Sequence, residues 1–332
     1  MRPHALGSPA VVVIAAGVCA ALHVGKLAPA LPVLRDALRV SLVQAGFLLS
    51  LVQLAGMLLG LLVGLWADGA GLRRSLLIGL LLLALASAGG VLAYSAIALL
   101  VLRAVEGLGF LLVALPAPGL IRRAVAPQRM SAVLGWWGAY MPLGTALALL
   151  TGPWVIASTN WQAWWWWLAA LSLVMALWVW VCVPLDPPVT TAQGYAGARP
   201  WADGARLPPA PSILHKASTA PSQTGLARLR QTLSARGPWL VALIFAMYSS
   251  QWLAVIGFLP TTVARAGLAA GVSAVLTASV AAVNILGNVL AGRLLQRGVP
   301  AQRLLLAGFG AMGLGALLAF GTWQGQPLPL AA

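Results

Sequence analysis

Long apolar runs, separated by short polar segments, make up most of this chain. A helix needs about 20 mostly apolar residues to cross a membrane. Nine runs reach about this length and predict nine membrane-spanning helices in an all-α membrane protein. The predicted spans are 9–34, 43–65, 75–94, 96–120, 131–157, 162–184, 238–259, 272–292 and 303–323.

The basic residues between these spans alternate in number from one side to the other. With a cytoplasmic N-terminus, fifteen Lys and Arg residues fall in cytoplasmic segments and three, Arg35, Arg39 and Arg265, in outside segments. Cytoplasmic loops of membrane proteins carry an excess of Lys and Arg. The pattern therefore supports the spans and predicts a cytoplasmic N-terminus.

The stretch 185–237 differs from the rest because it is polar, basic and rich in proline. This composition is typical of an irregular linker, and we expect a short surface helix near 224–234. The stretch divides the chain into three parts. These are an N-terminal six-helix bundle over 1–184, a cytoplasmic linker over 185–237, and a partial C-terminal bundle of three helices over 238–332.

Composition agrees with a membrane protein, because charged residues make up 8% of the chain against about a quarter in soluble domains. The net charge of +15 comes from short clusters between apolar runs, so no nucleic-acid partner is expected. Cys19 and Cys182 lie inside apolar runs and are expected to be reduced and packed. The five acids and three histidines show neither metal-ligand spacing nor a nucleophile pattern, so we expect no enzyme, catalytic residue, metal or cofactor.

Tryptophans crowd the start of the span 162–184, at positions 161 and 164–167. Tryptophan is enriched where membrane spans meet the aqueous interface. The run therefore predicts an interfacial belt, and a ligand-binding box is the alternative.

Four ionisable side chains fall inside predicted spans: His23 and Lys26 in the first, Arg103 and Glu106 in the fourth. A charge at the bilayer centre costs about 2.5–3.5 kcal/mol on insertion scales, so such groups usually face a cavity or a partner. In one interpretation Glu106 neutralises Arg103, Lys26 reaches outward and His23 packs in the core. In the other, Lys26 and Arg103 face one central cavity, where Lys26 has no partner and attracts an anionic solute.

The segment Gly64-Leu-Trp-Ala-Asp68-Gly69-Ala-Gly71-Leu-Arg73-Arg74 joins two uncharged runs and must turn back at one membrane face. Its spacing, G-x-x-x-D-G-x-G-x-R-R, resembles the loop between the second and third helices of the major facilitator superfamily. A membrane loop can also carry these residue types without a special role. The resemblance implies a conformational latch at the cytoplasmic face, made of Gly64, Asp68, Gly69, Arg73 and Arg74.

Other segments resemble the same superfamily. Arg103-Ala-Val-Glu106-Gly107-Leu-Gly109 is similar to its fourth-helix signature, in which the arginine faces the transport cavity. The glycine- and proline-rich stretch 135–153 is similar to its fifth helix. Three segments resemble the branch of cyanate and nitroimidazole permeases: Lys26-Leu-Ala-Pro29, Pro116-Ala-Pro118 and Tyr248-Ser-Ser-Gln251.

The resemblance covers about 10–320 and implies a major-facilitator-type helical bundle. Members of the superfamily have twelve helices, so nine predict a complete six-helix N-terminal half and a partial three-helix C-terminal half, apparently truncated after the ninth helix. Asn288-x-x-x-Gly292 before Arg293 matches Gly60-x-x-x-Gly64 before the first loop. This match favours two divergent repeats, as in many secondary transporters.

Residues and resemblance together predict a multi-pass transporter in a bacterial inner (plasma) membrane. It would move a small polar or anionic organic solute by alternating access, with a proton as a candidate coupling ion. A non-transporting remnant or a membrane interaction scaffold is the alternative. The predicted solute-binding residues are His23, Lys26, Arg103, Glu106, Tyr248, Gln251 and Asn284, with Glu106 either tuning Arg103 or carrying a proton.

Overall fold

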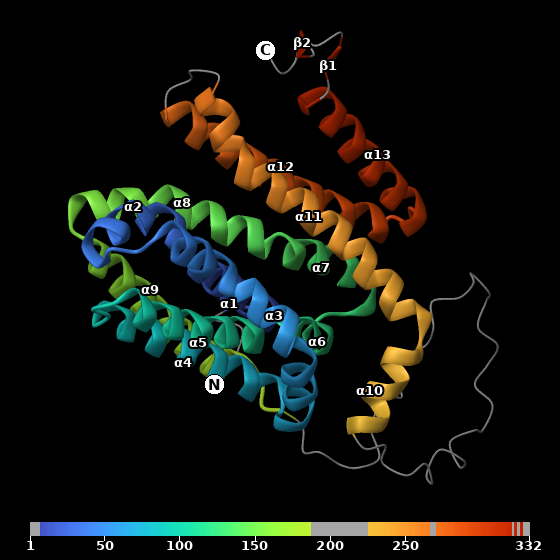
Figure 1. Ribbon diagram of the computed structural model, residues 1–332. Helices are drawn as coiled ribbons and strands as arrows, with labels where there is room; N and C mark the ends of the chain where they lie inside the picture. Colours follow the sequence, from blue (N-terminus) through green and yellow to red (C-terminus); the bar gives the residue numbers. More distant parts are fainter. Residues whose placement is uncertain (1–6, 187–224, 266–269, 321, 324–325, 328–332) are drawn as a thin grey trace, which may run out of the picture. The chain divides into compact units, whose positions relative to one another are not determined.

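The computed structural model describes residues 7–186, 225–265, 270–320, 322–323 and 326–327 (Figure 1). The structure divides into two compact units, Met1–Pro184 with Ala269–Ala332 and Leu185–Leu268. In the second unit, α10 (Gly225–Ser234) precedes α11 (Arg236–Arg265). The helix predicted near 224–234 is therefore present as α10.

The first unit holds the remaining elements in chain order. They are α1 (Pro9–Gly25), α2 (Leu27–Leu38), α3 (Leu42–Ala70), α4 (Leu72–Val91), α5 (Ala96–Ala114), α6 (Ala117–Ala124), the 3-10 helix η2 (Pro127–Arg129), α7 (Met130–Gly138), α8 (Tyr140–Ser158), α9 (Trp161–Cys182), α12 (Ala270–Gln296), α13 (Ala301–Phe320), β1 (Thr322–Trp323) and β2 (Gln326–Pro327). The two short strands pair antiparallel.

Three helices begin at a side chain that caps the helix start. Ser41 begins α3 with a capping box, in which its side chain accepts from the Gln44 amide while the Gln44 side chain accepts from the Ser41 amide. The side chains of Ser95 and Asn160 accept backbone N–H groups at the starts of α5 and α9. These bonds satisfy donors that a helix start leaves without partners.

Three predicted spans are each divided into two helices, which corrects the continuous helices expected there. α1, α5 and α7 each end four residues before a proline: Gly25 before Pro29, Ala114 before Pro118, and Gly138 before Pro142. A proline has no N–H to donate, and its ring clashes with the carbonyl four residues earlier. The prolines therefore account for the breaks between α1 and α2, α5 and α6, and α7 and α8.

The turn predicted over 64–74 is shorter than expected. α3 continues to Ala70 and α4 begins at Leu72, so Gly71 alone forms the turn, with a φ of 100°. Glycine adopts this conformation without the steric cost of a Cβ. A Cβ at Gly64 or Gly69 would meet nothing within 4 Å in the described part of the chain. Neither glycine is therefore needed for a close backbone approach.

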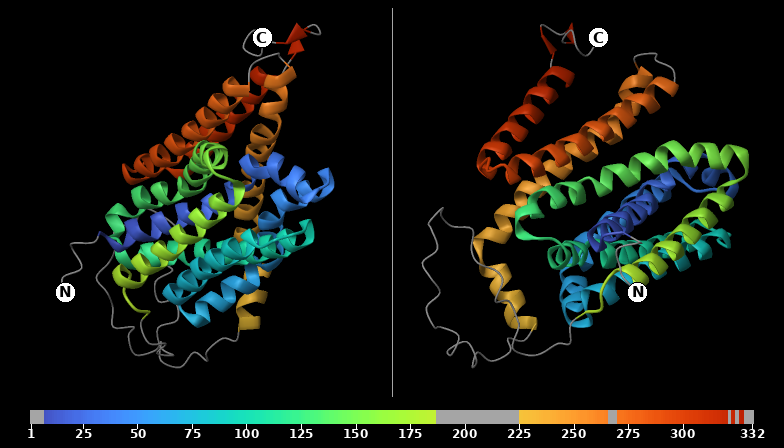
Figure 2. Two further views of the ribbon diagram at one scale, coloured as in Figure 1. Left: turned by 90° about the vertical axis from the view of Figure 1, so that its left-hand side faces the viewer. Right: turned by 180° about the vertical axis from the view of Figure 1, so that it is seen from behind.

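The first unit is a bundle of packed helices (Figure 2). α4 packs on α5 and α9, α1 lies against α8 and α9, α3 packs on α5, and α12 lies along α7 and α8. Its core includes the fully buried Leu76, Leu80 and Val179. Large apolar side chains such as Ile97 (69% exposed) and Trp154 (73% exposed) cover the outside. Such an apolar exterior suits contact with lipid.

Six helical segments in the described residues are long and apolar enough to cross a membrane, or seven if a bent pair within α3 counts as one span. α11 and α12, which cover the predicted spans 238–259 and 272–292, are not among these six. The structure thus supports a multi-pass membrane protein, while the nine-span count stays a prediction.

The tryptophan run at the start of α9 does not form a simple belt. Trp166 and Trp167 are exposed, as a belt requires, but Trp161, Trp164 and Trp165 are buried. Successive residues of a helix point in different directions, so a run of four necessarily faces both lipid and core. Cys19 and Cys182 are buried and form no disulfide in the described structure, which confirms their prediction as packed thiols.

Candidate functional site

The four ionisable side chains predicted inside spans meet in one buried cluster. Lys26, at the break between α1 and α2, forms an ion pair with Oε1 of Glu106 on α5. Nη1 of Arg103 donates to the other carboxylate oxygen, Oε2, at 2.7 Å. His23, Lys26, Arg103 and Glu106 are each 1–3% exposed. One carboxylate therefore serves two cations.

The expectation that Lys26 lacks a counter-charge is wrong, because Glu106 supplies it. Nζ of Lys26 also donates to Ser87 Oγ on α4 at 3.0 Å, and it lies 4.7 Å from the centre of the Trp165 ring on α9. A cation over a tryptophan face is stabilised by the ring quadrupole. Helical spacing pairs Arg103 with Glu106 on one helix, but it does not report that Lys26 reaches the same carboxylate from another helix.

Arg103 ties α5 to the end of α1. Its guanidinium donates to the carbonyl oxygens of His23 and of Val24, the latter at 3.0 Å, both in the last turn of α1. Its Nε donates to Leu48 O on α3 at 3.1 Å. Terminal carbonyls of a helix lack intrahelical partners and carry a partial negative charge, which a cation stabilises. Arg103 thus caps the helix end that Pro29 creates.

The two ring nitrogens of His23 face different polar groups. Nε2 lies 2.8 Å from Ser172 Oγ, and Ser172 Oγ donates to Leu168 O at 2.9 Å. The hydroxyl has one proton, so in this arrangement Nε2 carries the hydrogen and Ser172 accepts it. Nδ1 lies 3.9 Å from Glu106 Oε1 and has no hydrogen-bond partner within the described residues. A proton on Nδ1 would therefore face the carboxylate directly.

Sequence reasoning missed the groups that hold this cluster from α4 and α9. Trp164 Nε1 donates to Lys26 O at 3.2 Å, and Ser87 Oγ donates to Trp165 O at 2.9 Å. The tryptophan run was the available signal, since it places large side chains with N–H donors on an apolar helix. Ser87 and Ser172 gave no sequence signal, because a lone serine in an apolar run is common in membrane helices.

The cluster leaves no room for a solute in this structure. A cavity of about 10 Å³ adjoins Lys26, Arg103, Glu106 and Trp165. A single water needs roughly 10–15 Å³. The four groups are therefore a closed ionic network, and a solute can reach them only after the surrounding helices move apart.

The predicted latch is described in part. Arg73 Nη2 donates to Trp180 O on α9 at 2.6 Å, which fixes the start of α4 to the end of α9. The side chain of Asp68 lies outside the described residues. A latch joining Asp68 to Arg73 and Arg74 stays a prediction.

The predicted contributors from the second half lie on two helices. Tyr248 and Gln251 are half-buried on α11, in the second unit, and Asn284 is half-buried on α12. Asn288 Nδ2 donates to Asn284 Oδ1 at 2.8 Å. Of the seven predicted solute-binding residues, the ion pairs of the structure bring together His23, Lys26, Arg103 and Glu106. Among the described residues, no three His, Cys, Asp or Glu side chains group closely enough for a metal ion.

Comparisons with known proteins agree with this architecture. No curated protein matches the chain significantly. A solved structure with a similar fold is that of the major facilitator superfamily proton:xylose symporter XylE bound to 6-bromo-6-deoxy-D-glucose, with a TM-score of 0.65 and 15% sequence identity, covering 86% of this chain and 68% of that one. The family model of the Major Facilitator Superfamily matches residues 13–332. The chain therefore belongs to the Major Facilitator Superfamily, a family of membrane transporters and not of enzymes.

Proposed function

We propose that this protein is a secondary-active transporter that moves a small polar or anionic organic solute by alternating access. The observation that carries the proposal is the family match over 13–332, on a chain whose helices are long and apolar enough for several membrane spans. The similar fold of a proton:xylose symporter supports the same general activity. We place the protein in a bacterial inner membrane with a cytoplasmic N-terminus.

We further propose that a proton is the coupling ion and that Glu106 and His23 hold it. Glu106 binds Lys26 and Arg103 through separate oxygens, and His23 Nδ1 faces the same carboxylate at 3.9 Å. Adding a proton to the carboxylate removes the charge that holds both cations. The ion pairs at the end of α1 would then loosen, and this change links protonation to movement of the helices around the cluster.

The argument for an anionic solute changes, although the residues are those first expected. Lys26 already has a counter-charge, so it gives no independent reason for an anion. The cluster still holds two cations against one carboxylate, a formal charge of +1 with His23 neutral. That excess would attract an anion once the network opens. Tyr248, Gln251 and Asn284 remain proposed hydrogen-bonding groups for the solute.

The alternative function is a non-transporting membrane protein that binds a partner or retains only the fold. A transport assay separates the two. We would reconstitute the purified full chain in liposomes, impose an inward proton gradient, and measure uptake of radiolabelled D-xylose, cyanate and naphthalene-2-sulfonate. The sulfonate stays ionised and does not cross the lipid as a neutral acid, so its uptake reports the protein.

Saturable uptake of at least one probe, above that of empty liposomes, supports transport. Uptake equal to empty liposomes for all three probes, in protein that remains folded, would refute transport of these solute classes. It would favour the non-transporting alternative.

A further inference from the structure

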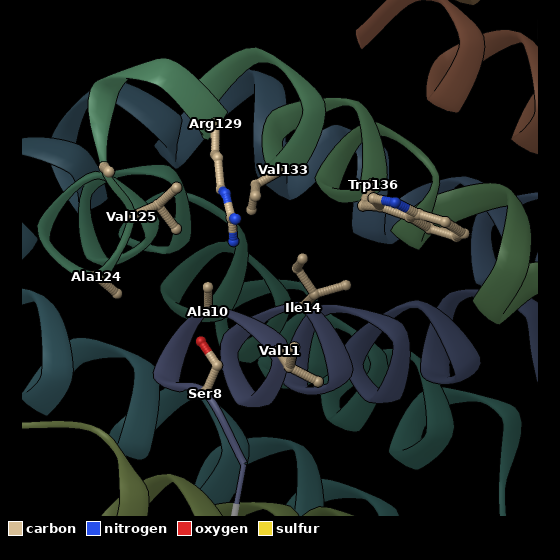
Figure 3. Close-up of a pocket in the computed structure, with 10 residues that line it drawn as sticks. Ser8, Ala10, Val11, Ile14, Ala124, Val125, Arg129, Val133 and Trp136 are labelled. Atoms are coloured by element: carbon tan, nitrogen blue, oxygen red, sulfur yellow. The ribbon is translucent and has the colours of Figure 1, made fainter. Parts of the chain in front are cut away.

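A second cavity lies apart from the ionic network, at the beginning of α1. It has a volume of about 540 Å³ and lies between α1, the segment joining α6 to η2, and α7 (Figure 3). Sites for organic ligands usually measure about 300–1,000 Å³, with mostly apolar walls and a few placed polar groups. The cavity is thus large enough for a whole organic solute, unlike the space beside Glu106.

The described residues of its walls are mostly apolar, and one of them, Arg129, is charged. Val11 and Ile14 of α1 face Val133 and Trp136 of α7, and the polar side chains on the lining are those of Ser8, Arg129 and the Trp136 indole. Figure 3 shows Arg129 extending from η2 into the space between α7 and α1. Val11 is 56% exposed and Trp136 is 47% exposed, so the walls are open to an occupant.

Arg129 is available for a ligand. Within the described part of the chain its guanidinium makes no ion pair or hydrogen bond, whereas Arg103 donates four hydrogen bonds to oxygen atoms. A guanidinium offers five N–H donors in a fork that matches two oxygens of a carboxylate, sulfonate or phosphate. No acidic side chain is among the described residues that line the cavity. The chemistry favours an anion.

We infer that this cavity binds an amphiphilic organic monoanion, with its anionic group on Arg129 and its apolar body against Val11, Ile14, Val133 and Trp136. The inference rests on the proposed transport function and names its solute class. A small polar anion would leave the apolar walls uncovered, and an uncharged hydrocarbon would gain nothing from the charge of Arg129. One charge beside a wide apolar wall selects a molecule with both features.

Equilibrium binding to the full chain in lipid nanodiscs tests this inference. The probe is radiolabelled naphthalene-2-sulfonate, compared with its neutral analogue naphthalene-2-sulfonamide and with methanesulfonate, which has the charge but no large apolar body. Empty nanodiscs give the background. We expect the naphthalene sulfonate to bind at least tenfold more tightly than either analogue.

Two matched pairs of variants locate the site. Arg129→Gln should weaken sulfonate binding at least tenfold, which corresponds to one lost charge-assisted contact. Arg122→Gln, an exposed arginine of the preceding helix outside the cavity, should leave binding unchanged. Trp136→Ala should weaken naphthalene sulfonate binding, whereas Trp154→Ala, also exposed but outside the cavity, should not. Thermal unfolding checks that all four variants remain folded.

The inference is overturned if the neutral analogue binds as tightly, if Arg129→Gln keeps wild-type affinity, or if Arg122→Gln weakens binding as much. It is also overturned if the probe binds in phosphatidylcholine discs but is displaced in phosphatidylglycerol discs, because a lipid headgroup is then the occupant. If the probe binds in an Arg129-dependent way but is not taken up, the inferred binding site is supported and transport of the probe is refuted. If the probe is taken up but its binding does not depend on Arg129, transport is supported and the inferred binding site is refuted.

Discussion

Glu106 is the residue on which the buried network depends. Its two oxygens satisfy Lys26 and Arg103 separately, and all three side chains are at most 3% exposed. Removing one partner of a buried ion pair leaves an uncompensated charge and costs about 3–5 kcal/mol, whereas replacing the whole pair with apolar groups costs much less. The two cations are therefore stable in the core only while the carboxylate is present.

A double-mutant cycle on Lys26 and Glu106 tests this dependence. Glu106→Gln should destabilise the fold by about 3–5 kcal/mol because it leaves Lys26 and Arg103 without their counter-charge. Lys26→Met should cost less, since Glu106 keeps Arg103. In the double variant the loss should be smaller than the sum of the two single losses. Thermal unfolding in nanodiscs measures all three, and additive losses would show that the two side chains do not interact.

At the scale of helices, close packing of α12 on α7 depends on glycine. A Cβ at Gly135 would lie 2.8 Å from Asn288 O and 2.9 Å from the Cα of Gly292. Both neighbours are backbone atoms, which cannot move aside as a flexible side chain can. Small residues allow membrane helices to approach this closely. The glycines in 135–153 that resemble the superfamily's fifth helix therefore have a packing role.

Alanine should destabilise the protein at one of two glycines and not at the other. Gly135→Ala should destabilise the protein by about 1–3 kcal/mol through overpacking against α12. Gly287→Ala is the control on α12, because a Cβ there meets nothing within 4 Å in the described structure. It should leave stability unchanged or raise it by up to about 1 kcal/mol, since alanine favours the helix. Equal losses at both positions would contradict the close α7–α12 contact.

Helix breaks show how far the sequence could predict this fold. The apolar runs indicate where the helices lie. The prolines at 29, 118 and 142 indicate the breaks, because each helix ends four residues before its proline. Continuous spans were expected because the prediction used the length of each apolar run and did not consider that proline has no N–H to donate. The contact between Lys26 and Glu106 could not be predicted from helical periodicity, because it depends on how α1, α5 and α9 pack. The cavity at Arg129 gave no sequence signal, since an arginine in a loop is usually solvated.

At the scale of the whole molecule, the family fixes the general architecture and the loop charges predict its orientation. Three arginines, Arg122, Arg123 and Arg129, flank the connection between the span that ends at Ala124 and the span that starts at Pro127. The connection 159–160, between the next two spans, has no charge. The excess of arginine predicts that the first connection is cytoplasmic and the second lies outside.

Alkaline phosphatase fusions test this orientation, because the enzyme is active only outside the cytoplasm. A fusion after Asn160 should be active and a fusion after Gln128 inactive. Matched expression of the two fusions, checked by immunoblot, is the control. The reverse activities would invert the topology and place Arg129 and its cavity outside.

Coupling of solute flux to a proton gradient tests the central claim most directly. In liposomes that contain the wild-type chain, an inward proton gradient should drive naphthalene-2-sulfonate above its equilibrium level, and a protonophore should abolish the accumulation. The Lys26→Met/Glu106→Gln double variant lacks the carboxylate of the proposed proton site, so it should exchange the probe across the membrane without accumulating it. Accumulation by the double variant equal to wild type would contradict coupling at Glu106, and absence of protein-dependent flux in the wild type would contradict transport itself.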